Sequence, residues 1–261
     1  MILAPDPLEA VRWEHHEVAV YSGLDLPSFA TFRREVVLAA VEALDTKIDA
    51  LEKSEEEVER VFAVDHYADI RQSTIEAFLL ATQSMHERAL RGLMVGMAGR
   101  QAWPAGRVQQ IQRCSLDGKG PNLLRFFHEL FDAPMEWFGV HTDLQFLYLL
   151  GNALRHGNGE SAIKIHQLAP SLWITWLPPG LTVGGLYTVT LDAPRHPAFD
   201  TITLPRVLLE QMMMAVMGFW EDIEFVRCNS FSRKSEGVEK HMNELREQRA
   251  RRSNERMWTP G

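Results

Sequence analysis

Cysteine is scarce in this 261-residue sequence, which contains only Cys114 and Cys228. Two cysteines so far apart in the chain do not form the closely spaced pair of a zinc motif, and they provide no disulfide framework. The sequence therefore predicts no metal site, and it is typical of a protein kept in a reducing compartment.

Long apolar runs are also absent. A membrane helix needs about 20 apolar residues, and the longest candidate, residues 207–220, is interrupted by Glu210 and Gln211. The N-terminal sequence MILAPDPLEA has acidic residues and prolines where a signal peptide has a basic and then an apolar region. We therefore expect a cytoplasmic protein without a membrane partner.

Several catalytic motifs are missing as well. The sequence contains no GxSxG, HExxH or GxxxxGK motif and no glycine-rich dinucleotide fingerprint after a strand. We expect no cofactor. The net charge of -8 excludes a general attraction for nucleic acid, so binding to RNA would require a local basic patch.

The sequence contains 46% hydrophobic residues, which is enough for a sizeable core. These residues recur mostly with helical spacing. One stripe runs from Val37 to Phe62 and predicts either a single long arm or two helices that break at Ser54, where Ser54 and Glu57 form a capping box. A further helix is predicted from Ile75 to about Gly99. The methionines in 212–217 are interpreted as core residues, with an adaptable partner surface as the alternative.

The connector from Arg100 to Gly120 is rich in glycine, proline and basic residues, so we interpret it as a loop and a candidate phosphate contact. Its cations are Arg100, Arg107, Arg113 and Lys119. The same connector suggests a division into an N-terminal helical region, 1–99, and a motif-bearing region, 100–261, although one continuous domain is equally compatible with the pattern.

A change of pattern follows between residues 162 and 204. Short apolar segments separated by Pro-Pro-Gly and Gly-Gly predict strands. They are 162–165, 172–177, 186–191 and 201–204. The predicted fold is therefore mainly α, a helical bundle with a small antiparallel β appendage.

The C-terminal segment from Arg233 to Arg256 contains eight basic and five acidic residues. Such a basic segment is typical either of a contact with RNA or of a solvated terminal helix. Trp258, close to the end of the chain, is large enough to require burial, and a second subunit is one source of it.

The segment LLGNALRHGNG, residues 149–159, holds the best candidate site. Leucines spaced three or four apart predict a helix that begins at a capping box of Thr142 and Gln145 and ends before Gly157. Asn152 and His156 lie four residues apart and share one helix face, whereas Arg155 is predicted to point elsewhere unless the helix frays. The alternative is that Asn152 and His156 only cap the ends of packed helices.

The order of Asn152, His156 and Gly157 resembles the R-N-x-x-x-H motif of the HEPN superfamily of helical bundles, which lies near the end of a bundle helix. The position of the family's arginine is occupied by Gly151. The resemblance implies a metal-independent ribonuclease in which His156, Arg155 and Asn152 are catalytic. It also implies a homodimer, because members of the family place two such motifs across a dimer interface.

In that interpretation His156 exchanges a proton with a ribose 2′-hydroxyl or with the leaving oxygen, Asn152 orients the phosphate, and Arg155 stabilises the developing charge. The alternative is a non-catalytic helical module that binds a partner protein or a nucleotide, with Gly151 marking the loss of the catalytic cation. RNA and a protein are therefore the two partners that the sequence suggests.

Overall fold

A computed structural model describes residues 6–53, 57–116, 120–184, 187–252 and 254–260. The chain divides into two compact units, each assembled from separate segments. Unit 1 comprises Met1–Val36, Ala81–Gln145 and Gln211–Arg256, and unit 2 comprises Val37–Leu80, Phe146–Glu210 and Met257–Gly261. The described residues form a mainly α-helical fold, as predicted.

Four helical elements contribute residues to both units. They are η2 (Phe32–Leu38, wound as a π-helix), α4 (Glu57–Arg100), α7 (His141–His156) and α9 (Arg206–Asn229). The sequence division at residue 99 does not coincide with the boundaries of these units, and independent folding of 1–99 and 100–261 stays a prediction. No helix in the described part of the chain combines the length and apolar character needed to span a bilayer.

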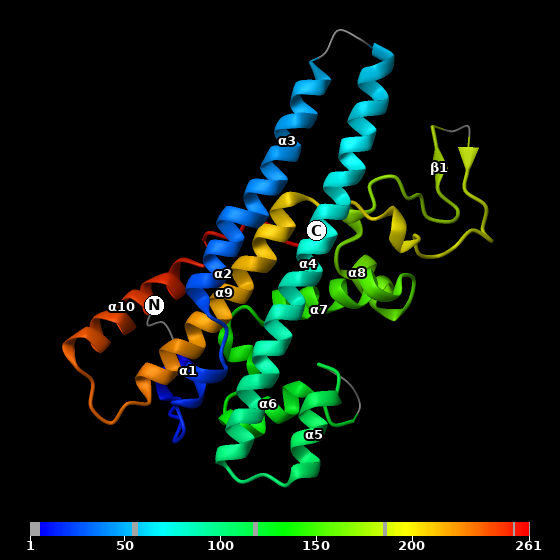
Figure 1. The fold of residues 1–261 in the computed structure, drawn as a ribbon. Coiled ribbons are helices and arrows are strands. Elements are labelled where there is room, and N and C mark those ends of the chain that lie inside the picture. Colours follow the sequence, from blue (N-terminus) through cyan, green and yellow to red (C-terminus); the bar gives the residue numbers. More distant parts are fainter. Residues whose placement is uncertain (1–5, 54–56, 117–119, 185–186, 253, 261) are drawn as a thin grey trace, which may run out of the picture. The chain divides into compact units, whose positions relative to one another are not determined.

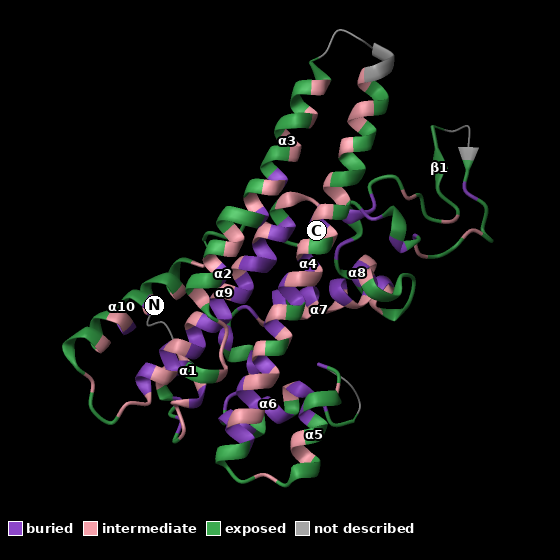
Figure 2. Cartoon of the chain, in the orientation of Figure 1, coloured by how far each residue is buried: buried purple, intermediate pink, exposed green. Residues whose placement is uncertain are grey.

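Unit 1 is built from shorter helices around the C-terminal part of α4, from Ala81 onward, and most of α9, from Gln211 onward (Figures 1 and 2). Its remaining elements are η1 (Pro7–Ala10), α1 (Val18–Ser22), α2 (Leu26–Thr31), α5 (Ala105–Arg113), α6 (Leu123–Phe131), η3 (Met135–Phe138) and α10 (Glu236–Arg251). The connector predicted as a loop therefore contains the helix α5. It folds because Ile111 is buried and Arg107 stacks on Trp103, 4.0 Å from the ring centre.

Aromatic side chains form the core of unit 1. Phe127 of α6 packs on Phe131 and Phe138, with ring centres 4.6 and 5.5 Å apart, and Phe138 packs on Phe219 of α9 at 5.0 Å. The contacts are tilted or edge-on, as favourable aromatic pairs are. The helix α6 begins directly after Asn122, which caps it by accepting a hydrogen bond from the Arg125 amide at 3.0 Å.

One titratable group lies inside this core. His86 of α4 is buried, and its Nδ1 accepts a 3.2 Å hydrogen bond from the Trp220 indole N–H. Burial lowers the pKa of His86 to about 4. The imidazole is therefore neutral at physiological pH, which suits its role as an acceptor.

Unit 2 contains a helical arm. In Figure 1 helix α3 (Ala39–Glu52) lies beside the N-terminal half of α4, and Asp45 joins the two helices through a 2.5 Å ion pair with Arg71. The two-helix alternative for this stretch is confirmed, because α3 ends at Glu52 and α4 begins at Glu57. Ser54 of the predicted capping box lies outside the described residues.

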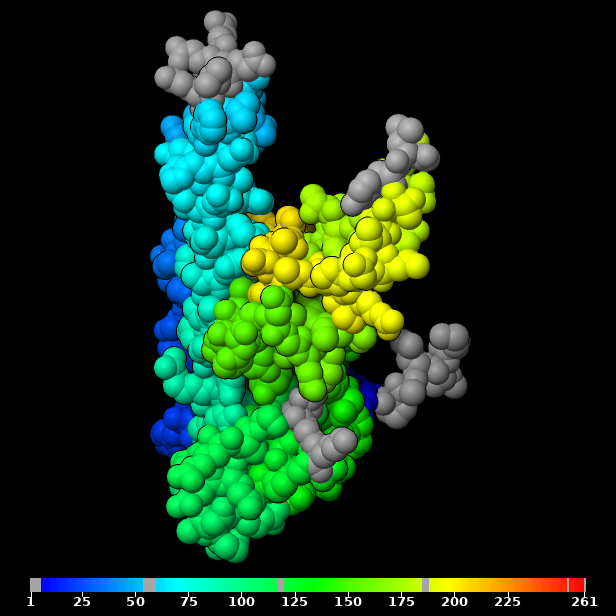
Figure 3. Space-filling model, turned by 90° about the vertical axis from the view of Figure 1, so that its right-hand side faces the viewer, coloured from blue at the N-terminus to red at the C-terminus, as the bar shows by residue number. Residues whose placement is uncertain are grey.

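The β appendage is smaller than predicted. It consists of one antiparallel pair, β1 (Thr182–Val183) with β2 (Tyr187–Thr188), and Figure 3 shows this segment standing out from the surface of unit 2. The strand predicted at 162–165 is wrong, because it lies in α8 (Glu160–Leu168). The strands at 172–177 and 201–204 are replaced by η4 (Pro170–Leu172), η5 (Phe199–Thr201) and irregular chain.

The helix α8 shows why these strand predictions failed. Ile163 and Ile165 alternate like the inward residues of a strand, but Ala162, Ile165 and Ala169 are buried at spacings of three and four. Glu160 in the first turn adds a favourable charge at the helix N-terminus. Short apolar runs of this kind are compatible with either structure, and packing selects the helix.

We expect His86 to make unit 1 sensitive to acid. Its pKa is about 6.5 in the unfolded chain and about 4 in the folded one, so the unfolded chain takes up a proton first as the pH falls. The free energy of unfolding should therefore decrease between pH 6.5 and 4, by on the order of 3 kcal/mol at most. The measurement is urea unfolding of the wild type and His86→Gln at pH 7 and pH 4.5. The variant should lose less stability over this interval, and identical losses would contradict the assignment.

Candidate functional site

The candidate site lies at the C-terminal end of α7, in unit 2. The helix continues through His156, and the Gly157 amide donates a 2.7 Å hydrogen bond to the Ala153 carbonyl. Gly157 has a φ of +69°, the left-handed conformation predicted for the residue after the helix. The predicted N-terminal capping box is wrong, since α7 begins at His141 and Thr142 lies inside its first turn.

Asn152 and Arg155 are brought together on this helix end. An Arg155 guanidinium N–H donates a 3.0 Å hydrogen bond to Asn152 Oδ1. Residues three apart on a helix are neighbours, as residues four apart are. The prediction that Arg155 points elsewhere is therefore wrong, and the cation shares the face of the amide without any fraying of the helix.

His156 is the last residue of α7, and its side chain is exposed, as is that of Arg155. Unpaired carbonyl groups at a helix C-terminus favour a positive charge nearby. Gly151, at the position of the HEPN arginine, is buried. The only site cation that the motif helix itself presents to solvent is therefore Arg155.

The loop after α7 is tied to a distant part of unit 2. Asn158 Oδ1 accepts a 2.6 Å hydrogen bond from the Phe199 amide at the start of η5. Together with the left-handed Gly157, this bond fixes the direction in which the chain leaves α7. The exposed end of the helix is thus a defined surface.

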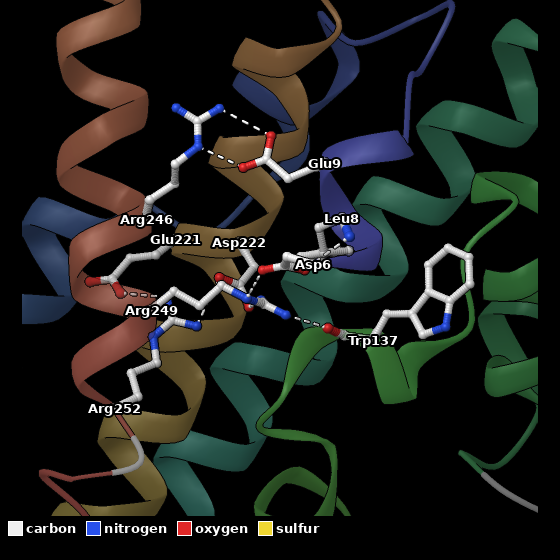
Figure 4. A network of polar contacts seen from close by, with 9 residues as sticks. All are labelled: Asp6, Leu8, Glu9, Trp137, Glu221, Asp222, Arg246, Arg249 and Arg252. Atoms are coloured by element: carbon white, nitrogen blue, oxygen red, sulfur yellow. Dashed lines mark hydrogen bonds and ion pairs between the residues drawn. The ribbon is translucent and has the colours of Figure 1, made fainter. Parts of the chain in front are cut away.

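The basic C-terminal segment forms α10 in unit 1, and four of its arginines pair with carboxylates of the same unit; Figure 4 shows three of them. Arg246 pairs with Glu9 at 2.6 Å, Arg252 with Glu221 at 2.9 Å, and Arg256, beyond α10, with Asp143 at 2.5 Å. Their positive charge is balanced within the protein. The side chains of Arg249 and Arg252 are only 20% and 17% exposed, so the solvated-helix alternative does not describe them, and a contact of the segment with RNA stays a prediction.

Asp222 of α9 is the centre of this network. Its side chain is 2% exposed, and it accepts hydrogen bonds from both Arg249 and Arg252, the latter at 2.8 Å. Arg249 also pairs with Asp6 at 2.7 Å and donates to the Trp137 carbonyl at 2.5 Å. Burial raises the pKa of Asp222 to about 6, while the two arginines act to lower it. Because this pKa is still below 7, the carboxylate is mostly ionised at neutral pH.

A cavity of about 560 Å³ lies next to this network in unit 1, with Gly139, Asp143, Met214 and Gln248 among its lining residues. Asp143 is buried and accepts a 2.9 Å hydrogen bond from Gln211 as well as the ion pair from Arg256. Asp143 and Arg256 thus balance each other in the wall. We assign the cavity no ligand.

Two basic residues of the connector are also paired. Arg107 forms an ion pair with Glu129, and Arg100 lies 3.6 Å from Glu17. Both pairs lie within unit 1. Lys119, the last cation of the connector, lies outside the described residues. The connector as a phosphate contact stays a prediction.

Trp258 finds a partner within its own chain. Its ring lies 5.0 Å from that of Phe146, and the side chain is half-buried. A second subunit is not required to cover it. The expectation of a homodimer therefore depends on the HEPN resemblance.

Compared with protein-family models, curated protein sequences and solved structures, this chain gives no match. The function is therefore inferred from the site.

The left-handed conformation of Gly157 predicts a specific effect of substitution. Gly157→Ala should lower the free energy of unfolding by about 1 kcal/mol, because a Cβ atom strains this conformation. Gly159→Ala is the matched control: Gly159 has an extended backbone with φ 178°, and neither position has an atom within 4 Å of an added Cβ. Chemical unfolding of both variants tests this, and equal losses would show that the cap is not the cause.

The buried position of Asp222 predicts a larger effect. Asp222→Asn leaves two guanidinium groups without their shared counter-charge and should cost about 3 kcal/mol. Glu9→Gln breaks the more exposed pair with Arg246 and should cost less than about 1 kcal/mol. Thermal unfolding at neutral pH distinguishes the two. A small effect of Asp222→Asn would mean that the arginines pair equally well elsewhere.

Proposed function

We propose that this protein is a HEPN-like, metal-independent ribonuclease that binds an RNA phosphate at the C-terminal end of α7. The observation that carries the proposal is the hydrogen bond that joins the exposed guanidinium of Arg155 to the half-buried amide of Asn152, at the helix end where His156 is also exposed. A cation and a hydrogen-bonding amide are suited to hold a phosphodiester. The imidazole of His156 at the same helix end is a group that can accept or donate a proton.

The reaction uses these side chains, the RNA and a second histidine that donates the proton to the leaving oxygen. Neutral His156 takes the proton of a ribose 2′-hydroxyl, and the 2′ oxygen attacks the adjacent phosphorus. The bond to the 5′ oxygen of the next nucleotide breaks, and this oxygen leaves as a hydroxyl once it receives a proton. Arg155 stabilises the charge on the phosphate oxygens, and Asn152 orients both Arg155 and the phosphate.

A homodimer completes this mechanism. The reaction uses a base on one side of the phosphorus and an acid on the other, and each copy of the motif offers one histidine at this helix end. A second α7 end facing the first would supply the second histidine and a second arginine. It would also compensate for Gly151 at the position of the family's arginine.

The second candidate function is a non-catalytic helical module that binds a protein partner. Two observations favour it: Gly151 replaces the family's catalytic arginine, and α4 exposes apolar side chains in unit 2. Val61 is 51% exposed, Phe62 73% and Ile70 37%. Exposed apolar side chains along one helix are typical of partner surfaces.

Cleavage of labelled tRNA and mRNA by the purified protein in the presence of EDTA tests the proposal. We expect wild-type cleavage to fall at least about 100-fold in His156→Ala and about 10- to 100-fold in Arg155→Ala. His128→Ala, a substitution of an exposed histidine in α6, is the matched control and should cleave like the wild type. Absence of cleavage by the wild type would favour the binding module.

The dimer is tested by mixing the wild type with an excess of His156→Ala. Because the composite site takes one histidine from each copy, a heterodimer lacks the base or the acid, and activity should fall further than it does when the wild type is mixed with the control variant His128→Ala. Light scattering at the assay concentration gives the mass. If the protein is monomeric and still cleaves RNA, the composite site is wrong but the ribonuclease proposal stands.

A further inference from the structure

Three potential metal ligands converge in unit 1, away from the arginine network around Asp222. Glu224 and Cys228 are one turn apart on α9, and His241 faces them from α10. Glu224 Oε1 lies 3.4 Å from Cys228 Sγ and 3.5 Å from His241 Nε2. All three donor atoms lie within 4.8 Å of one another.

These distances match the edges of a zinc coordination tetrahedron. Zinc binds cysteine sulfur at about 2.3 Å and histidine nitrogen or carboxylate oxygen at about 2.0 Å, so tetrahedral donor atoms lie about 3.3–3.6 Å apart. Two of the three edges already have this length. The third, between sulfur and nitrogen, is at most 4.8 Å and closes by a small rotation of the partly exposed His241 ring.

We propose that Glu224, Cys228 and His241 bind a zinc-like divalent cation between α9 and α10. One thiolate, one imidazole and one carboxylate form a donor set that suits Zn²⁺ and disfavours Mg²⁺ and Ca²⁺, which prefer oxygen ligands alone. Water occupies the fourth position, because three protein ligands leave the site open on one side. The bound cation would cross-link the last two long helices of the chain.

Neighbouring side chains form a suitable second shell. His241 Nδ1 lies 3.8 Å from Glu244, so the ring nitrogen opposite the metal position faces a carboxylate, as it does in many histidine zinc sites. Arg227 donates hydrogen bonds to both Glu224 oxygens, at 2.5 and 2.6 Å, and fixes the orientation of that carboxylate. Its positive charge also opposes the cation, so Arg227 limits the affinity of the site.

Binding of the cation replaces the proton of the Cys228 thiol, which is released to solvent, and forms the thiolate ligand.

Titration of the purified protein with Co²⁺, followed by its displacement with Zn²⁺, tests this site. We expect one Co²⁺ per chain, a thiolate-to-cobalt charge-transfer band in the near ultraviolet, and visible bands of tetrahedral strength. Cys228→Ser should abolish the charge-transfer band, and His241→Ala should weaken binding by more than about tenfold. Cys114→Ser is the matched control and should behave like the wild type, because Cys114 lies outside the cluster.

Arg227→Gln gives a second test, since removal of the opposing charge should tighten cobalt binding. Circular dichroism of each variant shows whether the helices are intact, and His241→Ala removes only a partly exposed side chain. A wild-type spectrum without a thiolate band, or one that survives in Cys228→Ser, would overturn the proposal. Binding that is equally strong in His241→Ala would also reject the three-ligand site.

Discussion

The pairing of one buried carboxylate with two arginines fixes the C-terminal helix. Arg249 lies in the last turn of α10, and Arg252 is its C-cap residue. Each of the two arginines donates a hydrogen bond to a different carboxylate oxygen of Asp222. Each arginine also has a second carboxylate, Asp6 for Arg249 and Glu221 for Arg252, so Asp222 is the group that links the two pairs. Its removal would break this link and leave each arginine with one partner. The same pairing sets the register of α10 against α9, which brings His241 opposite Glu224.

The end of α7 combines features that are separable in their physical origin. Gly157 terminates the helix through its backbone, Asn152 and Arg155 meet because they are three residues apart, and His156 is exposed because it is the last residue before the turn. None of these features depends on a substrate. The chemistry proposed for this surface therefore depends on whether RNA and a second copy reach it.

The local elements of this fold could be predicted from the sequence, and the contacts between distant segments could not. The glycine after the motif helix and the capped helix after Asn122 follow from rules that involve a few neighbouring residues. The positive charge of the C-terminal segment was visible, but its carboxylate partners lie at Glu9, Asp143 and Asp222. A charge pattern shows which residues require partners, whereas folding decides where those partners lie.

The cluster of Glu224, Cys228 and His241 was missed for the same reason. A search for paired cysteines excludes a site whose ligands are a glutamate and a cysteine on one helix and a histidine on the next. The signal that was present is the spacing of four between Glu224 and Cys228, which places both on one face of α9. Identifying the third ligand required the packing of α10.

The hydrogen bond between Asn158 and Phe199 joins the two ends of a segment of unit 2. This segment, which contains α8 and the β1–β2 hairpin, begins after the C-terminal end of α7 and is brought back to that end by the bond. The entropy cost of closing a loop rises only slowly with its length, and exposed hairpin tips tolerate insertions. The exposed segment around β1 can therefore lengthen, shorten or be exchanged while α7 keeps its shape, whereas the buried side chains of Ala162 and Ile165 hold α8 in place.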